Sequence, residues 1–421
     1  MAQEQLHKRR TSEQVTDIIS KYKHREIKAK EAAAYLGVGR TRFYQLVAAH
    51  EEQGSSFSIA YARKVPNNRI SPAVEKQIRR ELQAEKKLIE NQDVPVWRYN
   101  YSYVRDQLLE KYQELVSVNT IISRAKEWGF YQGKPPKQKH EREVVTNYTG
   151  ELIQHDSSHH LFAPLMGEKL YLATSLDDFS RALLYAELWE HETAWRHITA
   201  AKQVILEYGV PLKYYTDQHS IFRYVKNRDS HRYTYQKFTD DVDPQWRQVL
   251  KELTIEPIPA LSPQAKGKIE RPYGWIQDRM VRTCMNEKVT SLPGAQEVLR
   301  SLVYQYNWKW RHSTTGEIPM ERYQDAIREK KSLWRPFKIQ APYRDINDIF
   351  CLRTKRMVDA YRKVSIHNTQ LKVPAVPPRQ EVELRLSLDE KKQLVEVRFW
   401  FKGYCVGKQT VKMQELPGVH F

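Results

Sequence analysis

Apolar residues in the first part of the chain recur every three or four positions, which is the spacing of a helix with one buried face. Val15, Ile18 and Ile19 form such a face. Gly37 interrupts a second apolar pattern, and glycine commonly ends a helix because it tolerates a positive φ. The pattern predicts one helix around Val15 and Ile19 and two short helices on either side of Gly37, the second over residues 40–52.

Two short helices joined by a glycine-containing turn are the arrangement of a helix-turn-helix motif. In this motif the second helix lies in the major groove of DNA. An ordinary helical hairpin fits the same pattern, but small residues in the first helix and basic outward positions in the second favour DNA binding. We expect residues 1–56 to form this domain, with five side chains facing DNA: Arg40, Thr41, Arg42, Tyr44 and Gln45.

A second helical region follows a polar linker. Ser71 and Pro72 are the residue types preferred at the N-cap and the first position of a helix. Helical spacing returns at about 101–111 and 117–128. Residues 70–132 are therefore expected to form a second helical domain, which is either another helix-turn-helix or a simple spacer. If it binds DNA, the expected contact residues are Asn119, Thr120 and Arg124.

From Gly150 the pattern changes to short alternating stretches, which are typical of strands. Residues 169–189 predict two strands joined by a tight turn. A helix is predicted over residues 191–209 and another short strand over residues 210–217. Strands that alternate with helices predict a mixed sheet covered by helices.

Three carboxylates lie in segments that such a fold can bring together. Asp156 and Asp217 are each expected at the end of a short strand, and residues there suit a site beyond the sheet edge. Ser262 and Pro263 predict a helix start, which would place Glu270 about two turns inside that helix. Converging carboxylates repel one another and need cations, and hard oxygen ligands suit Mg²⁺. Taken singly, each of the three could instead cap a strand end or a helix.

The last part of the chain alternates again. A basic helical link is predicted over about 320–335, and several short strands at even spacing after it predict a small β-barrel over 350–415. Arginine and lysine between these strands favour non-specific DNA contacts, although a barrel that binds protein fits the same pattern. The predicted strand regions are 356–373, 381–388, 394–401 and 404–411.

Charge divides the chain into three parts. The 421 residues include 69 Lys and Arg against 51 Asp and Glu, a net charge of +18. Residues 1–140 have a net charge of +10, residues 141–330 of −1, and residues 331–421 of +9. Such an excess can serve solubility alone, but basic proteins of this kind more often bind a polyanion. We therefore expect nucleic acid as a partner.

Composition excludes several other classes. Cys284, Cys351 and Cys405 are too few and too far apart for a disulfide scaffold or a four-cysteine zinc site. No apolar run reaches the roughly 20 residues that a membrane helix needs, and the polar start of the sequence does not resemble a secretory signal. We expect a soluble cytoplasmic protein with no membrane partner.

Several motifs of the middle region occur together in an order that resembles a known family. They are Gln154-His155-Asp156, Leu176-Asp177-Asp178-Phe179-Ser180-Arg181, Tyr215-Thr216-Asp217, the stretch from Ser262 to Arg271, Tyr306-Asn307, Arg311-His312-Ser313 and Pro319. Over roughly 140–330 they resemble the integrase core of DDE transposases and retroviral integrases. The flanking regions are similar to those of bacterial insertion-sequence transposases and the phage Mu transposase.

The resemblance implies a fold and a site. The fold class would be multidomain α+β, with N-terminal helix-turn-helix modules, a central α/β ribonuclease-H-like core over 145–330, and a small C-terminal β-barrel. Asp156, Asp217 and Glu270 would be the catalytic residues and would hold two Mg²⁺ ions, for which Mn²⁺ can substitute.

Residues just before the third carboxylate have two interpretations. Lys266 lies one helical turn before Glu270 and could simply pair with it, although lysine before glutamate is the weaker orientation. With neighbouring polar residues, contact with DNA phosphates near the metals is favoured. The expected DNA-contacting residues here are Gln264, Lys266 and Lys268.

The sequence departs from retroviral integrases in two ways. Between Asp217 and Glu270 lie 52 residues, more than in retroviral integrases, and part of this stretch looks like an insertion. No cysteine precedes Cys284, so the retroviral His-His-Cys-Cys zinc module is absent and helix-turn-helix DNA binding takes its place.

Other polar residues have less specific interpretations. His155, His159 and His160 could suggest a zinc site, but surface or substrate-contacting roles are favoured because no further ligand completes the set. Asp177 and Asp178 are expected in a turn between strands, with direct metal binding the less favoured alternative.

The combined expectation is a DNA transposase of the DDE type that binds transposon ends, cleaves their 3′ ends with metal ions and transfers them into target DNA. It would act as a homo-multimer assembled on double-stranded DNA, in the cytoplasm of a bacterium and associated with the nucleoid. Two alternatives remain: a catalytically inactive (domesticated) DNA-binding regulator, and a metal-dependent nuclease without strand transfer.

Overall fold

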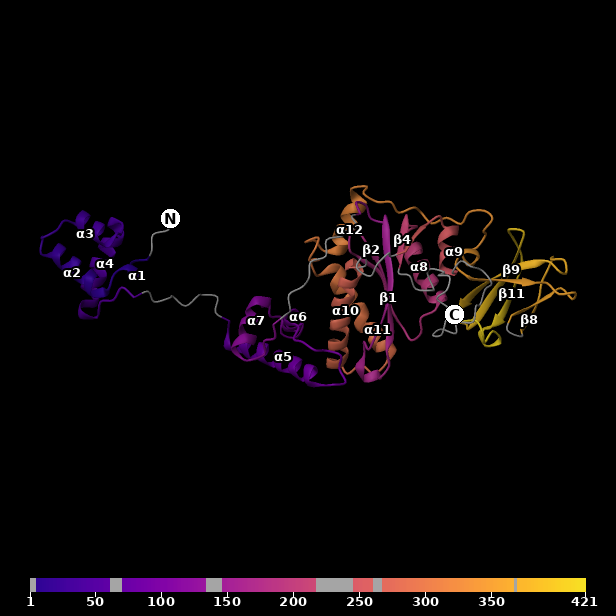
Figure 1. Ribbon diagram of the computed structural model, residues 1–421, viewed down its shortest axis with the longest axis horizontal. Coiled ribbons are helices and arrows are strands. Elements are labelled where there is room, and N and C mark those ends of the chain that lie inside the picture. The colour runs from indigo at the N-terminus through magenta and orange to yellow at the C-terminus, as the bar shows by residue number, and fades with distance from the viewer. Residues whose placement is uncertain (1–4, 61–69, 134–145, 217–244, 260–266, 367–368) are drawn as a thin grey trace. The chain divides into compact units, whose positions relative to one another are not determined.

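The structure is a computed structural model and describes residues 5–60, 70–133, 146–216, 245–259, 267–366 and 369–421 (Figure 1). The chain divides into two compact units, Met1–Lys76 and Gln77–Phe421. Within the described residues, no helix has the length and apolar character needed to cross a bilayer.

The first unit is a small bundle of helices, which we call the first helical module. Gly37 adopts a φ of +61° after α3, as the sequence predicts, and only a residue without Cβ does so without strain. The apolar faces meet in a core that includes Val15, Leu36 and Phe43. Its helices are α1 (Leu6–Arg9), α2 (Ser12–Lys23), α3 (Ala29–Leu36) and α4 (Arg40–Gln53), followed by a 3₁₀ turn, η1 (Gly54–Ser56).

The second helical module comprises α5 (Pro72–Glu90), α6 (Tyr101–Tyr112) and α7 (Val118–Glu127). The Ser71 hydroxyl accepts a hydrogen bond from the backbone N–H of Val74 at 3.3 Å, and the Ser117 hydroxyl accepts one from Thr120 at 3.1 Å. Both serines therefore cap helices where the sequence predicts helix starts.

A five-stranded mixed sheet forms the centre of the second unit (Figure 1). Its strand order is β3-β2-β1-β4-β5, with β1 antiparallel to β2 and parallel to β4. This order, with helices on both faces, is that of a ribonuclease-H-like core and confirms the predicted mixed sheet. The strands are β1 (Leu152–His160), β2 (Leu170–Asp177), β3 (Leu183–Trp189), β4 (Lys213–Thr216) and β5 (Glu256–Pro259).

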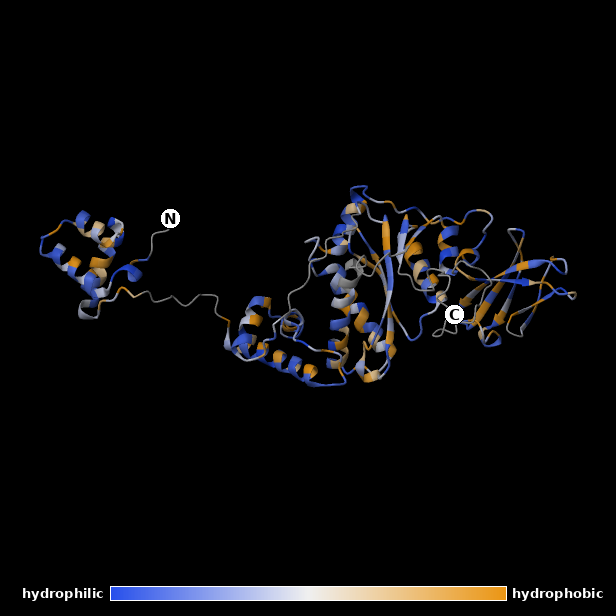
Figure 2. Ribbon diagram, in the orientation of Figure 1, coloured by the Kyte–Doolittle hydropathy of each residue, from blue (hydrophilic) through white to orange (hydrophobic). Residues whose placement is uncertain are grey.

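Alternation along the strands sends side chains to two different cores. On β2, Leu170 and Leu172 pack with α10 and α11. Ala173, the next residue, lies on the opposite face and joins the core beneath α8 and α9. Figure 2 shows hydrophobic residues along the strands of this sheet and along the helices beside it. The helices are α8 (Ala194–Tyr208), α9 (Gln245–Glu252), α10 (Gly267–Asn286), α11 (Leu292–Trp308) and α12 (Pro319–Arg328), with a 3₁₀ turn, η2 (Pro164–Met166).

The predicted basic link is helical only as far as Arg328. The chain beyond α12 instead runs along the core, because Ser332 forms a backbone bridge with Thr149 and Arg335 forms one with Val210. These tertiary pairings replace the helical hydrogen bonds that the sequence pattern suggests.

The C-terminal region is an antiparallel sheet of order β11-β10-β9-β6 with a separate hairpin, β7-β8. The predicted strands at 381–388, 394–401 and 404–411 are confirmed, whereas the region 356–373 contains a hairpin and only the end of the strand before it. A closed barrel is not among the pairings of the described residues. The elements are α13 (Ile346–Ile349), β6 (Leu352–Met357), β7 (Lys363–Ile366), β8 (Thr369–Lys372), β9 (Glu381–Asp389), β10 (Leu394–Phe401), β11 (Tyr404–Lys412) and a 3₁₀ turn, η4 (Met413–Glu415).

Candidate functional site

Asp156 lies in the middle of β1, so the expectation that it ends a short strand is wrong. The strand continues because β1 pairs with β2 from Ile153 as far as His160, which lies opposite Leu170. On its other side β1 pairs with β4 only as far as Gln154, opposite Tyr215. Asp156 therefore lies just beyond the parallel pair, at 9% exposure, where the sheet loses one neighbour.

A buried tyrosine of α10 fixes the backbone at this position. The Tyr273 hydroxyl donates to the carbonyl oxygen of Asp156 at 2.5 Å and accepts a hydrogen bond from Thr174 at 2.9 Å. Burial, with the negative charge of Asp156, raises the pKa of Tyr273 well above its usual value, so the hydroxyl remains a donor. One turn further along α10, the Gln277 amide donates to the Ser158 hydroxyl at 2.5 Å.

The other two predicted carboxylates are only partly described. β4 ends at Thr216, and Asp217, the next residue, lies outside the described residues. Glu270 belongs to α10, but its side chain lies outside them. Among the described residues, no three His, Cys, Asp or Glu side chains are arranged to hold a metal ion. The triad stays a prediction.

The predicted DNA-contacting residues beside the third carboxylate also fall in this part of the chain. Gln264, Lys266 and the helix start at Ser262-Pro263 lie outside the described residues, and of Lys268 only the helical backbone is described.

The predicted turn at Asp177 and Asp178 is confirmed, and both carboxylates stabilise it. Asp177 is fully buried and accepts hydrogen bonds from the backbone N–H groups of Ser180 and Gly150, each at 2.9 Å. Burial raises its pKa. Asp178 forms a buried ion pair with Arg181 at 3.0 Å. These contacts account for both residues as parts of the turn.

His155 is buried at 1% exposure, so a surface or substrate-contacting role is wrong for this residue. Alternation along β1 turns it toward α8, away from the face of Asp156. Its Nδ1 lies 2.8 Å from the Ser175 hydroxyl, and its Nε2 lies 2.8 Å from Nδ1 of His197. His197 continues this chain of contacts to Glu192 at 2.9 Å.

The other two histidines of this strand are more accessible. His159 is exposed and stacks on Tyr171, with 4.2 Å between the ring centroids. His160 is half-buried, and burial lowers its pKa, which favours the neutral ring.

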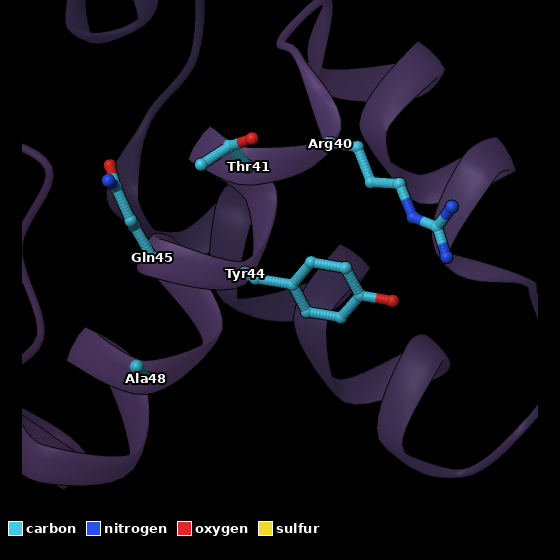
Figure 3. Close-up of a pocket in the computed structure, with 5 residues that line it drawn as sticks. All are labelled: Arg40, Thr41, Tyr44, Gln45 and Ala48. Carbon is cyan, nitrogen blue, oxygen red and sulfur yellow. The ribbon is translucent and has the colours of Figure 1, made fainter.

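The first helical module presents the predicted contact residues of α4 on one exposed surface. Figure 3 shows four of these side chains, all but that of Arg42, around a shallow hollow. The Arg40 guanidinium lies 5.9 Å from the centre of the Tyr44 ring, and Arg42 donates to the Gln45 side chain at 3.1 Å. The pKa of Tyr44 is lowered mainly by a hydrogen bond with Arg40 and, to a smaller extent, by one with Tyr22. The hollow is lined by Arg40, Thr41, Tyr44, Gln45 and Ala48.

The predicted contact residues of α7 are less uniform. Asn119 is exposed, but the Thr120 hydroxyl lies 2.8 Å from the Ser117 hydroxyl at the helix cap. Arg124 pairs with Glu127 at 3.1 Å. DNA contact through Thr120 or Arg124 would therefore exchange an existing interaction for a new one.

Comparison with known proteins finds relatives among transposases but no matching family model. The y4bF protein of Sinorhizobium fredii, named as a transposase, is 27% identical over 267 residues, which are 62% of this chain and 53% of that protein. The transposase for insertion sequence IS1202 of Streptococcus pneumoniae is 26% identical over 274 residues, 65% of this chain and 51% of that protein. The chain spans about half the length of the curated relatives it matches.

Solved structures with a detectable likeness include retroviral integrases. The HTLV-2 integrase catalytic core domain in complex with magnesium, in a trimeric form, has a TM-score of 0.32 and 18% identity and covers 43% of this chain and 99% of its own. The simian T-cell lymphotropic virus intasome, in complex with a PP2A regulatory subunit, has a TM-score of 0.35 and 12% identity and covers 74% of this chain and 94% of its own.

The chain is similar in sequence to these two curated transposases. The second of them is the transposase of a bacterial insertion sequence.

Proposed function

We propose that this chain is a DDE-type DNA transposase that binds transposon ends, cleaves their 3′ ends and transfers them into target DNA. The observation that carries the proposal is the position of Asp156, on a strand that contacts both β4 and α10. Asp217 follows the first of these elements and Glu270 belongs to the second.

The register of the sheet supports a pairing of the first two carboxylates. Paired residues of β1 and β4 are 61 positions apart, from Leu152 with Lys213 to Gln154 with Tyr215. Asp156 and Asp217 are separated by the same number of residues. Neighbouring parallel strands in register present equivalent side chains on the same face.

The hydrogen bonds of α10 support the third carboxylate. Residues three apart on a helix lie on the same face. Glu270 precedes Tyr273 by three residues, and the Tyr273 hydroxyl contacts the backbone of Asp156. The helix that carries Glu270 is thus fixed against the strand that carries Asp156.

These residues fit a pair of Mg²⁺ ions, with Mn²⁺ as a substitute, because all three are hard oxygen donors and Asp156 lies where β1 has lost its β4 neighbour. Bound there, the ions would activate an attacking oxygen and stabilise a leaving one. The protein's own part is to hold the carboxylates at fixed positions, which Tyr273 and Gln277 do for β1 through hydrogen bonds.

Both basic ends of the chain suit double-stranded DNA as the partner. In this proposal α4 reads the transposon end, with Arg40, Thr41, Arg42, Tyr44 and Gln45 in the groove. Asn119, Thr120 and Arg124 of α7 add contacts, and the C-terminal sheet, as a small barrel, binds DNA without sequence preference. Two ends must be joined together, so a homo-multimer on DNA is implied, in the bacterial cytoplasm at the nucleoid.

The test incubates labelled element ends, which are taken from the DNA that flanks the gene, with the full chain and Mg²⁺. The products are then identified. A transposase gives 3′-cleaved and joined products, a nuclease gives only cleaved ones, and a regulator binds without cleavage. Asp156→Asn, Asp217→Asn and Glu270→Gln should each abolish both products and leave end binding largely intact. Near-normal activity in any one variant would remove that residue from the site.

A further inference from the structure

The helix α10 has two buried faces of different character. One face is apolar and packs into the core of the catalytic domain through Ile276, Met280 and Cys284. The other carries two arginines, Arg279 and Arg282, which are only 4% and 1% exposed. Buried arginines are rare unless they are paired, so something must cover and neutralise this second face.

The second helical module supplies the partners of Arg282. This guanidinium forms an ion pair with Glu85 of α5 and another with Asp278, one turn back on α10, at 2.9 Å. It also donates to the backbone carbonyl of Arg98 at 2.6 Å. Asn100 connects the two carboxylates, because its backbone N–H donates to Glu85 at 3.1 Å and its side chain donates to Asp278.

A second set of contacts lies about one turn away and involves α6. Arg279 donates to Asp106 at 2.9 Å and to the Ser102 hydroxyl at 3.1 Å. The Tyr103 hydroxyl lies 3.2 Å from the Thr283 hydroxyl of α10. Together with the Glu85 group, these contacts attach α5 and α6 to the same stretch of α10, and we call them the α10 ion-pair network.

Burial and pairing have opposite effects on the charged groups of this network. Burial raises the pKa of Glu85 even though Arg282 opposes the shift, whereas the pKa of Arg282 is raised because Glu85 and Asp278 outweigh its burial. Buried ion pairs add little net stability compared with apolar packing, and in some proteins they fix one arrangement of the packed segments. The network is therefore better suited to fixing the orientation of α10 than to adding stability.

That orientation matters at the other end of the helix. Arg282 follows Glu270 by 12 residues, which is roughly 18 Å along an α-helix. Between them Tyr273 and Gln277 hold the helix against β1. A change in the tilt of α10 at Arg282 would therefore move the turn that carries Glu270, with the contact between α10 and β1 as the pivot.

We propose that Arg279 and Arg282 are positioning residues, which fix α10 against the second helical module so that the helix bearing the third carboxylate and a DNA-binding module form one body. The inference rests on the proposed function for its meaning, since it concerns the placement of Glu270. The position of the helix itself can be tested without any catalysis.

The test uses the full chain with Glu85→Met and Arg282→Met together, because this removes both fully buried charges of the pair. Asp278, which is one-third exposed, keeps its hydrogen bond from the Asn100 side chain. Hydrogen exchange of α10 residues 267–276 should be faster in this variant than in the unaltered chain. Half-saturation by Mn²⁺ with DNA bound should need roughly tenfold more metal, as when a residue that orients a ligand is lost. Binding of element ends should change little.

Arg300→Met is the matched control, because Arg300 forms an exposed ion pair with Glu297 at 2.8 Å on α11 and does not belong to the network. Its exchange and metal requirement should equal those of the unaltered chain. Unchanged exchange over residues 267–276 in a folded Glu85→Met, Arg282→Met variant would overturn the positioning role. An unaltered chain that neither binds Mn²⁺ nor cleaves DNA would instead overturn the proposed function and leave the exchange result to decide the positioning role.

Discussion

The two helical modules have the same sequence pattern but use their polar faces differently. In the first module the contact residues of α4, such as Arg40 and Gln45, are exposed, and its ion pairs, such as Lys21 with Asp17, lie at the surface. In the second module Glu85 and Asp106 are buried and pair with arginines of α10. One module leaves its charged side chains exposed, and the other pairs them within the chain.

This difference shows what helical periodicity can and cannot reveal. Apolar spacing identifies the face of a helix that meets its neighbours in the same module. It does not reveal whether the polar face is solvated or covered by a segment that comes much later in the sequence. Arg282 lies nearly 200 residues after Glu85, and nothing in the local pattern of either helix marks them as partners.

The largest difference between the two modules is expected when one buried charge is lost. Arg282→Met alone should lower the free energy of unfolding of the second unit by about 3–5 kcal/mol, because Glu85 would remain buried without its partner. Arg40→Met in the first module should change stability by less than about 0.5 kcal/mol. Urea denaturation of both variants measures the difference. Equal losses of stability would mean that the buried and the exposed arginine are equivalent for the fold.

A smaller effect is expected on recognition of DNA. Gln45→Ala should reduce the discrimination between element ends and random DNA by about 1–3 kcal/mol, because a contact with a base edge would be lost. Lys21→Ala, an exposed substitution on α2, is the control and should leave discrimination unchanged. Competition binding at fixed salt provides the measurement. Equal discrimination by the Gln45→Ala variant and the unaltered chain would exclude Gln45 from base readout.

The smallest effect concerns features that the two modules share. Thr11 caps α2 and Ser117 caps α7, each by accepting a backbone hydrogen bond. Replacing either with alanine should cost about 1 kcal/mol of stability. Thermal unfolding should show similar losses for both variants, and a much larger loss for one would mean that its cap has a tertiary role as well.

Much of the fold could be predicted from local chemistry. Gly37 and the Ser71-Pro72 pair mark helix boundaries through backbone preferences that act within a few residues, and alternation identified the strands of the central sheet. The length of β1 could not be predicted, because it depends on pairing with β2, and Asp156 is therefore mid-strand rather than at an end.

The candidate site was predictable only in part. Motif order identified Asp156, but the role of Tyr273 depends on a contact between residues 117 positions apart. Its only signal in the sequence is the three-residue spacing from Glu270, which puts both on one face of a helix. The burial of His155 follows from the alternation of β1 once the strand is known to continue past it.

The proposed metal site that acts on DNA includes Asp156, and Mn²⁺ binding is the sharpest test of this role. Electron paramagnetic resonance should count two Mn²⁺ ions bound per chain in the complex of the full chain with an element end. Asp156→Asn should lose most of this binding at equal DNA occupancy, while Glu190→Gln, an exposed carboxylate of the same domain, should keep it. Equal Mn²⁺ binding by the Asp156→Asn variant and the unaltered chain would exclude Asp156 from the metal site.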